Sequence, residues 1–415
     1  MANKVIIVGG GIVGLMSAFY LNQKGWEVTV LDKGDFSDNC SYGNAGMIVP
    51  SHFTPLATPG IISQGIRWMF NSKSPFYVKP SLNFDLINWG LKFIKSAKES
   101  HVEKSSPYLR DLNLYSSELY NELSEIIKNT FELEKKGILM LYKTQKTEEE
   151  EVHLAQKARD LGLDAEVLSR QQLKLLEPDL NLDVLGGVHY KCDGHLNPTA
   201  LMSGLLAHLR SAGVRLIPNQ QVCKVAKSPH KILSITTLSG EEYKADQYVF
   251  ANGASLQELS KKTKLTVPVM PGKGYSFFTK SFQQKLKHPA ILIEAKVALT
   301  PMQGKVRIGG TMELAAINTT INKTRVIGIV ESIPHYFSGI EVSFPEDIWY
   351  GFRPCSPDGL PYLGKSKTYG NLILAGGLGM MGLSLGPAVG KVVSDLANDK
   401  SPQPNIEIFN PERFN

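Results

Sequence analysis

Apolar residues open the chain in a short unbroken run, and the period of the pattern then changes twice within forty residues. Residues 5–8 are apolar and β-branched, which is typical of a buried parallel strand. After a glycine-rich turn, apolar residues return at the spacing of one helix face, at Leu15, Ala18, Phe19 and Leu21. A second strand-like run follows at residues 27–31 and ends at Asp32. The pattern therefore predicts a strand–helix–strand unit at the start of the chain.

Similar elements recur in the middle and near the end of the chain. Residues 197–212 predict a helix with Pro198 in its first turn, and residues 147–165 predict an exposed helix that starts with acidic residues. We expect short strands at residues 214–217, 222–225, 232–237, 242–244, 247–254 and 371–375. The last of these strands runs into a second glycine-rich turn and another apolar helix.

The first glycine-rich turn has the spacing of a dinucleotide-binding loop. Gly9, Gly11 and Gly14 form a G-x-G-x-x-G pattern between a predicted strand and a predicted helix. The first glycine permits the tight turn, the second lets the backbone approach a pyrophosphate, and the third lets helix and strand pack closely. Asp32 at the end of the second strand can accept hydrogen bonds from ribose hydroxyls. This loop alone does not separate NAD from FAD.

Two other segments favour a flavin. Residues 40–46 come too soon after Asp32 for a third strand of an NAD fold, and their small and amide-bearing side chains could border a large flat ring. The alternative is a surface turn. Residues 376–382 form the second glycine junction, where a helix N-terminus could face an electron-rich oxygen. Junctions at both ends of the chain suggest one nucleotide domain closed by both termini.

Seven segments together carry a resemblance to a known family. They are, in chain order, VIIVGGGIVGL, SYGNAGMIVP, DGHLNP, VFANGAS, PGKGYS, GFRPCSPDGLPYLG and GMMGLSLGPAVGK. In this order and over nearly the whole chain, the sequence resembles the D-amino-acid dehydrogenase/glycine oxidase branch of the FAD-dependent D-amino-acid oxidase superfamily. It departs from its relatives at Leu378, where they commonly carry a histidine.

The resemblance implies an α/β fold, α+β overall, with a Rossmann-like FAD-binding domain of the D-amino-acid oxidase/glutathione-reductase type and an inserted mixed-sheet substrate domain. The FAD-binding domain would comprise residues 1–58, 193–268 and 346–415, and the substrate domain residues 59–192 and 269–345. The FAD-binding residues that it implies are Gly9, Gly11, Ile12, Val13, Gly14, Asp32, Lys33, Ser41, Asn44, Ala45, Gly46, Val222, Gly253, Gly379, Met380, Met381, Gly382 and Leu383. Some relatives hold the flavin covalently on a cysteine, but Cys355 lies at a different offset, so we expect non-covalent FAD. We expect no metal, since the four cysteines are scattered along the chain.

The resemblance also implies an activity. A D-amino acid, or a D-imino acid such as hydroxy-D-proline, would deliver a hydride from Cα to flavin N5, with its amine neutral at that moment. The electrons would pass to a quinone or another carrier. Two alternatives stay open: an oxidase that uses O₂ on glycine, sarcosine or a D-amino acid, and a non-catalytic flavin-binding protein.

Three side chains are candidates for contact with the substrate. Arg353 can bind a carboxylate through two parallel hydrogen bonds, or it can form an ion pair that joins two domains. Tyr275 could close the pocket with its hydroxyl, or it could be a strand aromatic in the core. His52 could accept the proton of the substrate ammonium, or it could be a hydrogen-bonded structural residue. His195 is expected to hold the turn before the helix at residues 197–212.

Composition adds limits to this picture. The chain has 415 residues, 42% of them hydrophobic and 20% charged, which argues against disorder, collagen and coiled coils and suggests two to three domains. The net charge of +6 is spread along the chain without a basic run, so we expect no nucleic-acid partner. The sequence does not indicate an oligomeric state.

The expected location is the cytoplasm. The four cysteines are scattered, the first residues do not read as a signal peptide, and no apolar stretch is long enough to span a bilayer. Residues 58–96 interleave aromatic residues with lysines and arginines. We interpret this segment as a helical cap on the substrate domain, with contact to the inner face of the membrane as the alternative.

Overall fold

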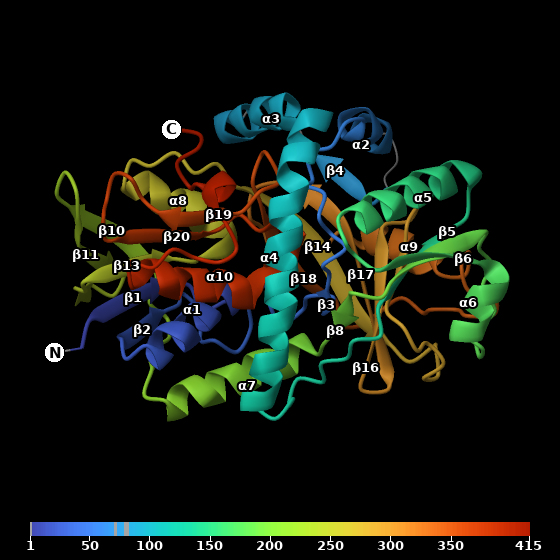
Figure 1. Ribbon diagram of the computed structural model, residues 1–415, viewed down its shortest axis with the longest axis horizontal. Helices are drawn as coiled ribbons and strands as arrows, with labels where there is room; N and C mark the ends of the chain where they lie inside the picture. Colours follow the sequence, from blue (N-terminus) through green and yellow to red (C-terminus); the bar gives the residue numbers. More distant parts are fainter. Residues whose placement is uncertain (1, 70–72, 79–82) are drawn as a thin grey trace.

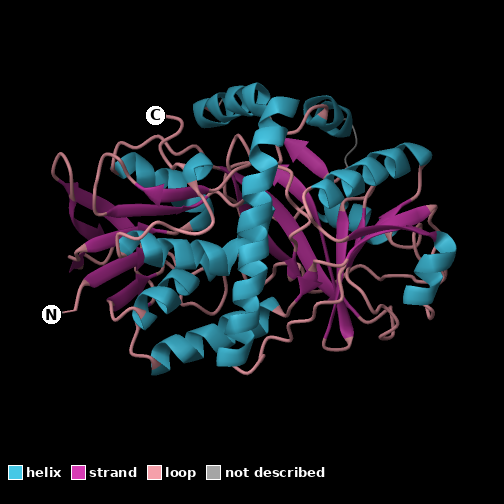
Figure 2. Cartoon of the chain, viewed as in Figure 1, coloured by secondary structure: helices cyan, strands magenta, loops and turns pink. Residues whose placement is uncertain are grey.

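The chain folds into two sheets that lie side by side, with one long helix along the boundary between them. The computed structural model describes residues 2–69, 73–78 and 83–415. In Figure 1 the first sheet occupies the left half, the second sheet the right half, and α4 (Glu99–Ile126) runs between them. Figure 2 shows helices flanking both sheets. The mixed α/β architecture that the sequence predicts is confirmed.

The first sheet has six strands in the described part of the chain, and the predicted buried runs form its centre. All neighbours pair in parallel except the edge strand β19, which is antiparallel to β20. Across the sheet the order is β19 (Tyr362–Lys365), β20 (Leu372–Gly376), β13 (Gln247–Phe250), β1 (Lys4–Val8), β2 (Glu27–Leu31) and β9 (Arg215–Ile217). The central strands are apolar on both sides, so both faces of this sheet must be covered.

Different layers cover the two faces. Helices pack on the face to which Val5 and Ile7 point. They are α1 (Ile12–Gln23), α7 (Pro198–Ser211) and α10 (Gly382–Ala397). A small antiparallel sheet and a short helix cover the face of Ile6 and Val8. These are β10 (Val222–Lys227), β11 (Ile232–Thr237), β12 (Glu242–Tyr243) and α8 (Leu256–Lys262).

The strands of the first sheet come from three distant stretches of the chain, which lie within the three segments expected for a nucleotide domain. β18 (Trp349–Cys355) is different, because it falls inside the third expected segment yet pairs with a strand of the second sheet. The boundaries of the two domains stay a prediction.

The second sheet is mixed and has nine strands among the described residues. Across the sheet the order is β18, β14 (Met270–Thr279), β17 (Lys305–Leu314), β16 (Val297–Met302), β15 (Ala290–Leu292), β5 (Ile138–Tyr142), β7 (Gly186–Tyr190) and β6 (Ala165–Ser169), and β4 (Phe76–Val78) also pairs with β17. On its outer face lie α9 (Lys323–Ser332) and the apolar cluster around Phe277 and Ile308. Its inner face packs against the chain segment that contains Met47, Val49 and Phe53.

Alternation along β14 assigns side chains to these two faces. Ser276 points inward, since its hydroxyl donates a hydrogen bond to the carbonyl of Gly43 (2.8 Å). Tyr275 points outward into the cluster on the outer face. Residues directly opposite each other on neighbouring strands share a face. Arg353, opposite Gly272, is therefore an inward residue.

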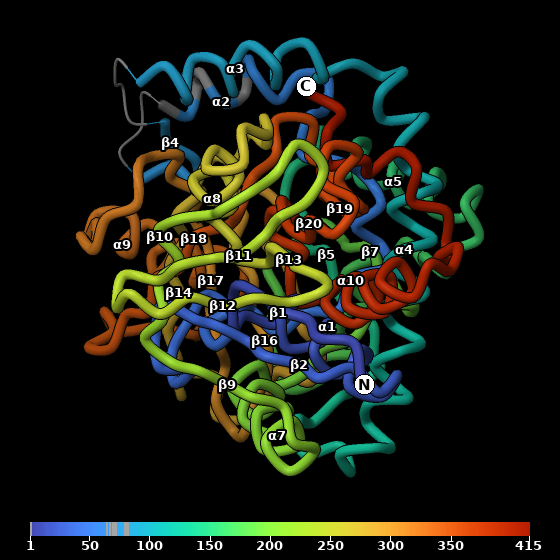
Figure 3. Tube along the Cα trace, turned by 90° about the vertical axis from the view of Figure 1, so that its left-hand side faces the viewer, coloured from blue at the N-terminus to red at the C-terminus, as the bar shows by residue number. Residues whose placement is uncertain are grey.

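Two helices and a short strand cover one end of the second sheet. Figure 3 shows α2 (Ile61–Met69) and α3 (Phe84–Ser96) together at the top, near the C-terminus. Trp89 of α3 is buried and donates a hydrogen bond from Nε1 to the carbonyl of Cys355 (2.8 Å). The segment 58–96 thus forms a cap where it is described, and its residues 70–72 and 79–82 lie outside the described residues.

One predicted helix ends earlier than expected. Helix α5 (Gln145–Asp160) stops five residues before position 165, because Gly162 adopts a φ of +78° and the next residues form β6. Short elements complete the description: β3 (Met47–Ile48) pairs with β8 (Gly194–His195), and α6 (Arg170–Leu176) follows β6.

Candidate functional site

The glycine loop lies at the carboxyl ends of β1 and β2, and its backbone conformation requires glycine. Gly9 has a φ of +116°, and a Cβ there would lie 2.4 Å from the carbonyl oxygen of Ala251. A Cβ at Gly14 would lie 1.9 Å from the carbonyl oxygen of Gly9. Gly11 is the N-cap of α1, whose first residues are Ile12 and Val13. The loop therefore presents the amino end of a helix at the sheet edge, as the sequence predicts.

Asp32 closes this loop from the end of β2. Its Oδ2 accepts a hydrogen bond from the Gly10 amide (2.6 Å), and its Oδ1 accepts one from the Gly34 amide (2.7 Å). Asn39 donates from Nδ2 to the carbonyl of Gly10 (3.2 Å). The predicted ribose ligand thus also fixes the shape of the glycine loop, and Lys33 beside it is exposed.

Residues 41–46 run from the glycine loop to the inner face of the second sheet. Ser41 Oγ accepts a hydrogen bond from the Ile12 amide at the start of α1 (3.0 Å). Asn44 Oδ1 accepts one from the Gly46 amide (2.8 Å). Gly46 has a φ of +78°, and a Cβ there would lie 2.3 Å from the carbonyl oxygen of Leu196. Ala45 packs with the apolar cluster under the second sheet. This segment lies between the two sheets, which excludes a simple surface turn.

The second glycine junction lies beside the first, because α10 packs against the start of α1 with Gly386 next to the Ile12 side chain. Gly379, Met380 and Met381 form a single 3₁₀ turn, and α10 starts at the next residue, Gly382. The Val49 amide donates a hydrogen bond to Ser384 Oγ on α10 (3.0 Å). Tyr120 of α4 donates to the carbonyl of Leu383 (2.6 Å). The start of α10 is therefore tied both to the segment after the 41–46 loop and to the long helix at the boundary.

Arg353 is half-buried on the inner face of the second sheet, close to this meeting point. Its Nη1 donates a hydrogen bond to the carbonyl of Thr311 (2.8 Å). It lies across Gly274, where a Cβ would be 2.0 Å from Nη1. The neighbouring amide of Phe352 donates to Sγ of Cys40 (3.3 Å), which ties β18 to the 41–46 segment. Burial lowers the pKa of the guanidinium, and among the described residues Arg353 forms no ion pair.

A second arginine, which the sequence analysis missed, also faces inward. Arg307 of β17 is buried and donates from Nη1 to Ser276 Oγ (3.3 Å), the hydroxyl that itself donates to Gly43. Its guanidinium lies 4.2 Å from the centre of the Phe278 ring. Its Nε is buried without a hydrogen-bond partner among the described residues, and burial lowers its pKa to about 10. A single charged residue inside the otherwise uncharged run 306–310 was the signal that could have revealed it.

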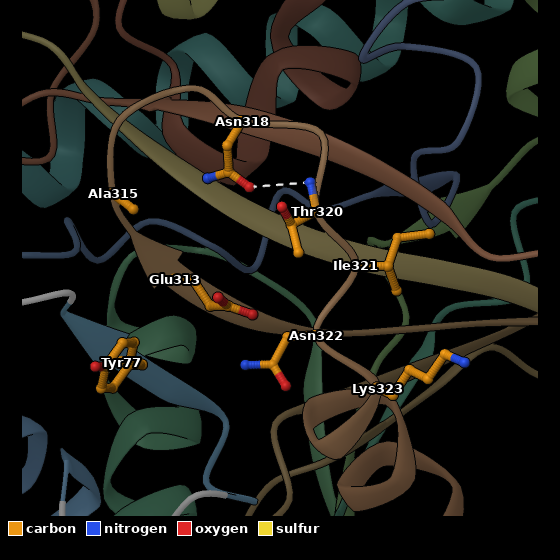
Figure 4. Close-up of a pocket in the computed structure, with 8 residues that line it drawn as sticks. All are labelled: Tyr77, Glu313, Ala315, Asn318, Thr320, Ile321, Asn322 and Lys323. Carbon is orange, nitrogen blue, oxygen red and sulfur yellow. Dashed lines mark hydrogen bonds between the residues drawn. The ribbon is translucent and has the colours of Figure 1, made fainter.

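Tyr275 lies on the outer face of the sheet, away from Arg353. Its hydroxyl accepts a hydrogen bond from the Asn322 amide (3.1 Å). Figure 4 shows the pocket on this outer side, about 600 Å³ in volume, with Glu313, Tyr77 and Asn322 in its lining. The structure therefore does not bring Tyr275 together with the other two candidate substrate residues on one face of the sheet.

His52 lies three residues beyond Val49, on the same segment that contacts α10. Its Nδ1 is 3.2 Å from Oγ of Ser51, and Ser51 in turn bonds the buried carboxylate of Asp193. Burial, with a smaller effect of Lys296, lowers the pKa of His52 to about 4. His195 is buried in β8 opposite Met47 of β3, where its backbone pairs also with Glu134. It holds the chain before α7, as the sequence predicts.

Comparison with known proteins identifies the family of this chain. The family model described as FAD dependent oxidoreductase matches residues 4–396 of the chain. The chain belongs to this FAD-dependent oxidoreductase family. The predictions that it is an enzyme and that its cofactor is FAD are confirmed.

Individual relatives of this FAD-dependent oxidoreductase match it over its whole length. The D-amino acid dehydrogenase of Helicobacter pylori is 31% identical over 410 residues, which cover 99% of this chain and 98% of the relative. The D-amino acid dehydrogenase of Azorhizobium caulinodans is 28% identical over 425 residues, covering 99% and 100%. Among solved structures, glycine oxidase from Geobacillus kaustophilus matches with a TM-score of 0.80 at 22% identity, covering 99% of both chains. The last comparison shows a shared fold.

The residues present in this oxidoreductase fit FAD. Asn252 Oδ1, beside Gly9, is buried and has no hydrogen-bond partner among the described residues. Gly253 and Gly379 both have a φ of +53°, and a Cβ at either of them, or at Gly382, would meet no atom within 4 Å. Val222 is half-buried at the start of β10. Glycines that border open space allow a flat group to approach the backbone closely.

One further observation concerns membranes. Among the described residues of this FAD-dependent oxidoreductase, no helix is both long enough and apolar enough to cross a bilayer.

Proposed function

We propose that this enzyme oxidises D-amino acids, or D-imino acids such as hydroxy-D-proline, and passes the electrons to a quinone or another carrier. The observation that carries the proposal is Arg353: a half-buried guanidinium on the inner face of the second sheet that has no ion-pair partner among the described residues. A buried charge without a partner is costly, so a carboxylate supplied by the substrate would stabilise it. The name that the relatives carry, D-amino acid dehydrogenase, supports the same substrate class.

The residues of this chain would then share the work as follows. Arg353 binds the substrate carboxylate. Its guanidinium is oriented by the hydrogen bond to the Thr311 carbonyl, and it can pass across Gly274 because glycine has no side chain there. His52, neutral at physiological pH, accepts a proton from the substrate ammonium. FAD, when bound, would accept the two electrons of the hydride from Cα. Trp349, whose ring lies over Gly43 and Gly351, excludes water from the inner face of the sheet.

The flavin would be held without a covalent bond. The thiol of Cys355 is buried and donates a hydrogen bond to the carbonyl of Arg353 (3.5 Å). Burial raises the pKa of this thiol to about 12. A thiol that stays protonated is a poor nucleophile, which supports non-covalent FAD.

The test is anaerobic bleaching of the purified holoenzyme by a panel of D- and L-amino acids, glycine, sarcosine and hydroxy-D-proline. We expect the visible flavin absorbance to fall with D-compounds and to stay with their L-enantiomers. Air admitted afterwards should restore the colour slowly, and a soluble quinone should restore it fast. Bleaching by glycine or sarcosine alone would overturn the substrate class, and fast recovery in air would favour an oxidase.

We also propose that α3 rests on an anionic membrane surface. Its outer side carries an apolar stripe at helical spacing, with Phe84 86%, Ile87 48%, Leu91 64% and Ile94 53% exposed. The lysines Lys95 and Lys98 are exposed at the end of this helix. An apolar stripe flanked by cations is typical of a helix that lies in the headgroup region of a bilayer, where a quinone would be accessible.

Replacing Leu91 with glutamate should therefore reduce binding to vesicles that contain phosphatidylglycerol by at least about tenfold, because burial of one leucine contributes about 1.5–3 kcal/mol. Cosedimentation measures the effect. The matched control is Leu175→Glu, which changes a leucine that is 80% exposed on α6, outside the cap. Equal binding by the wild-type chain and Leu91→Glu would contradict the membrane contact.

A further inference from the structure

Behind His52 lies a buried carboxylate to which the mechanism above gives no role. Asp193 is fully buried, and it lies between β7 and β8, immediately before β8 begins. Its Oδ2 accepts a hydrogen bond from Ser51 Oγ (2.5 Å), and its Oδ1 accepts one from the Ser51 amide (2.9 Å). The carboxylate is thus aimed at the residue that precedes His52.

Donors and acceptors alternate along the contacts from Asp193 through Ser51 to His52. An ionised carboxylate only accepts hydrogen bonds, so the Ser51 hydroxyl must donate to Asp193. The lone pairs of Ser51 Oγ then remain for His52, whose Nδ1 lies 3.2 Å away. Nδ1 must therefore carry the proton, and Nε2 is left as the acceptor on the other side of the ring. When it is ionised, Asp193 therefore sets the tautomer of His52 through Ser51.

The charges around this chain of contacts come from several elements. Lys296, in the turn between β15 and β16, acts on His52 and lowers its pKa. The positive charge of the same lysine also lowers the pKa of Glu151 on α5, against the larger effect of burial, which raises it. On the other side, Cys192 donates a hydrogen bond from Sγ to Asp193 Oδ1 (3.5 Å). The negative charges of Asp193 and Glu151 both raise the pKa of the Tyr190 hydroxyl, in addition to the larger effect of burial. Burial raises the pKa of Asp193 to about 7, although the hydrogen bonds from Ser51 oppose this shift.

Burial of His52 and the positive charge of Lys296 disfavour a second proton on its ring. With a pKa of about 4, about one His52 ring in a thousand would carry both protons at pH 7. A proton that arrives at Nε2 must therefore leave from Nδ1. Ser51 is the neighbour at Nδ1, and Asp193 is the group behind it that can bind a proton near neutral pH.

We propose that Ser51 and Asp193 are positioning residues that form a proton relay behind His52 and receive the proton of the substrate ammonium. The proposal rests on the proposed function. The ammonium N–H bond breaks as an Nε2–H bond forms on His52. The Nδ1 proton moves to Ser51 Oγ, and the Ser51 hydroxyl proton moves to Asp193 Oδ2. The net change is a neutral substrate amine, a neutral His52 and a protonated Asp193.

The first test is the pH dependence of anaerobic flavin reduction in the holoenzyme. The relay accepts a proton only when Asp193 is ionised, so kcat/KM should rise through a midpoint near pH 7 in the wild-type enzyme. In Asp193→Asn and Ser51→Ala that midpoint should vanish, and at pH 7 reduction should slow by about a hundredfold, the typical contribution of a general base. Ser51→Thr keeps the hydroxyl and should restore both the rate and the midpoint.

The matched control is Ser106→Ala, which removes another buried serine hydroxyl, one that donates to the carbonyl of Val102 within α4 (2.7 Å). It should lower stability as Ser51→Ala does and leave the pH midpoint in place. An unchanged midpoint in both Asp193→Asn and Ser51→Ala would overturn the relay.

The second test needs no turnover. In holoenzyme labelled with ¹⁵N-histidine and held well above pH 7, where Asp193 is ionised, the nitrogen shifts of His52 should show a proton on Nδ1. In Asp193→Asn the new amide group donates to Ser51 Oγ, so the hydroxyl turns toward His52 and the proton should move to Nε2. A wild-type ring protonated on Nε2, or no change in Asp193→Asn, would overturn the relay. If no D-compound reduces the flavin, the proposed function fails while these shifts still report on the order of the hydrogen bonds.

Discussion

Arg353→Ala is expected to lower kcat/KM for a D-amino acid by about two hundred- to five thousandfold, because loss of one partner from a buried ion pair costs about 3–5 kcal/mol. FAD content should stay at the wild-type level, since the glycine loop and Asp32 hold their shape without Arg353. Anaerobic flavin reduction with a D-amino acid and with the matched amine that lacks the carboxylate measures the effect. The two compounds should react at similar rates in the variant and at very different rates in the wild-type enzyme.

Two substitutions sharpen this test. Arg353→Lys keeps the charge but loses the planar fork, so it should recover only part of the lost activity. Arg325→Lys changes another buried arginine, which lies on α9 and donates to Ser74 Oγ (2.9 Å). It should leave the discrimination between the amino acid and the amine unchanged. If Arg353→Ala kept this discrimination, the carboxylate would be bound elsewhere, and Arg307 would be the next candidate.

Gly14→Ala is expected to abolish FAD binding, the second large effect. A Cβ at this position would lie 1.9 Å from the carbonyl oxygen of Gly9, which is backbone and cannot move aside as a side chain can. The start of α1 would be pushed away from β1, and with it the amides that face the pyrophosphate. The protein should be purified without yellow colour, and isothermal titration with FAD should show an affinity at least about a hundredfold weaker than that of the wild-type apoprotein, corresponding to about 2.7 kcal/mol.

Gly370→Ala is the matched control, because a Cβ there meets no atom within 4 Å. This variant should bind FAD as the wild-type chain does. A yellow Gly14→Ala protein with full flavin content would show that the loop tolerates the added atom and that the tight packing of helix against strand is not required.

The parts of the fold that were predicted are those that local sequence patterns determine. The run 5–8, the glycines after it and the strand ending at Asp32 lie next to each other in the chain, so their spacing alone predicts how they fold. The second junction at residues 376–382 follows the same rule. Helix α7 was located to within one residue at each end because Asn197 caps it and Pro198 is its first residue.

The parts that escaped prediction depend on contacts between distant residues. Whether Tyr275 or Ser276 faces inward depends on the register of β14, since successive side chains of a strand point to opposite faces. No local pattern in the run 271–276 tells which face meets the 41–46 segment. The contact of Ser51 with Asp193 spans 142 positions, and the role of Arg307 depends on a serine of the neighbouring strand. Contacts of this kind can be recognised only from the three-dimensional arrangement of the strands.

The three-part origin of the first sheet also governs when it can be assembled during synthesis. β1 emerges from the ribosome before the other strands of this sheet, but one neighbour, β13, begins at Gln247, and β20 beside that strand ends only at Gly376. Helix α10, which packs on α1, comes later still. Pairings across so many residues form slowly, and incomplete sheets expose unpaired strand edges to aggregation or to chaperones. The residues that would hold FAD therefore come together only after α10 has been translated, so cofactor uptake follows the synthesis of all three segments.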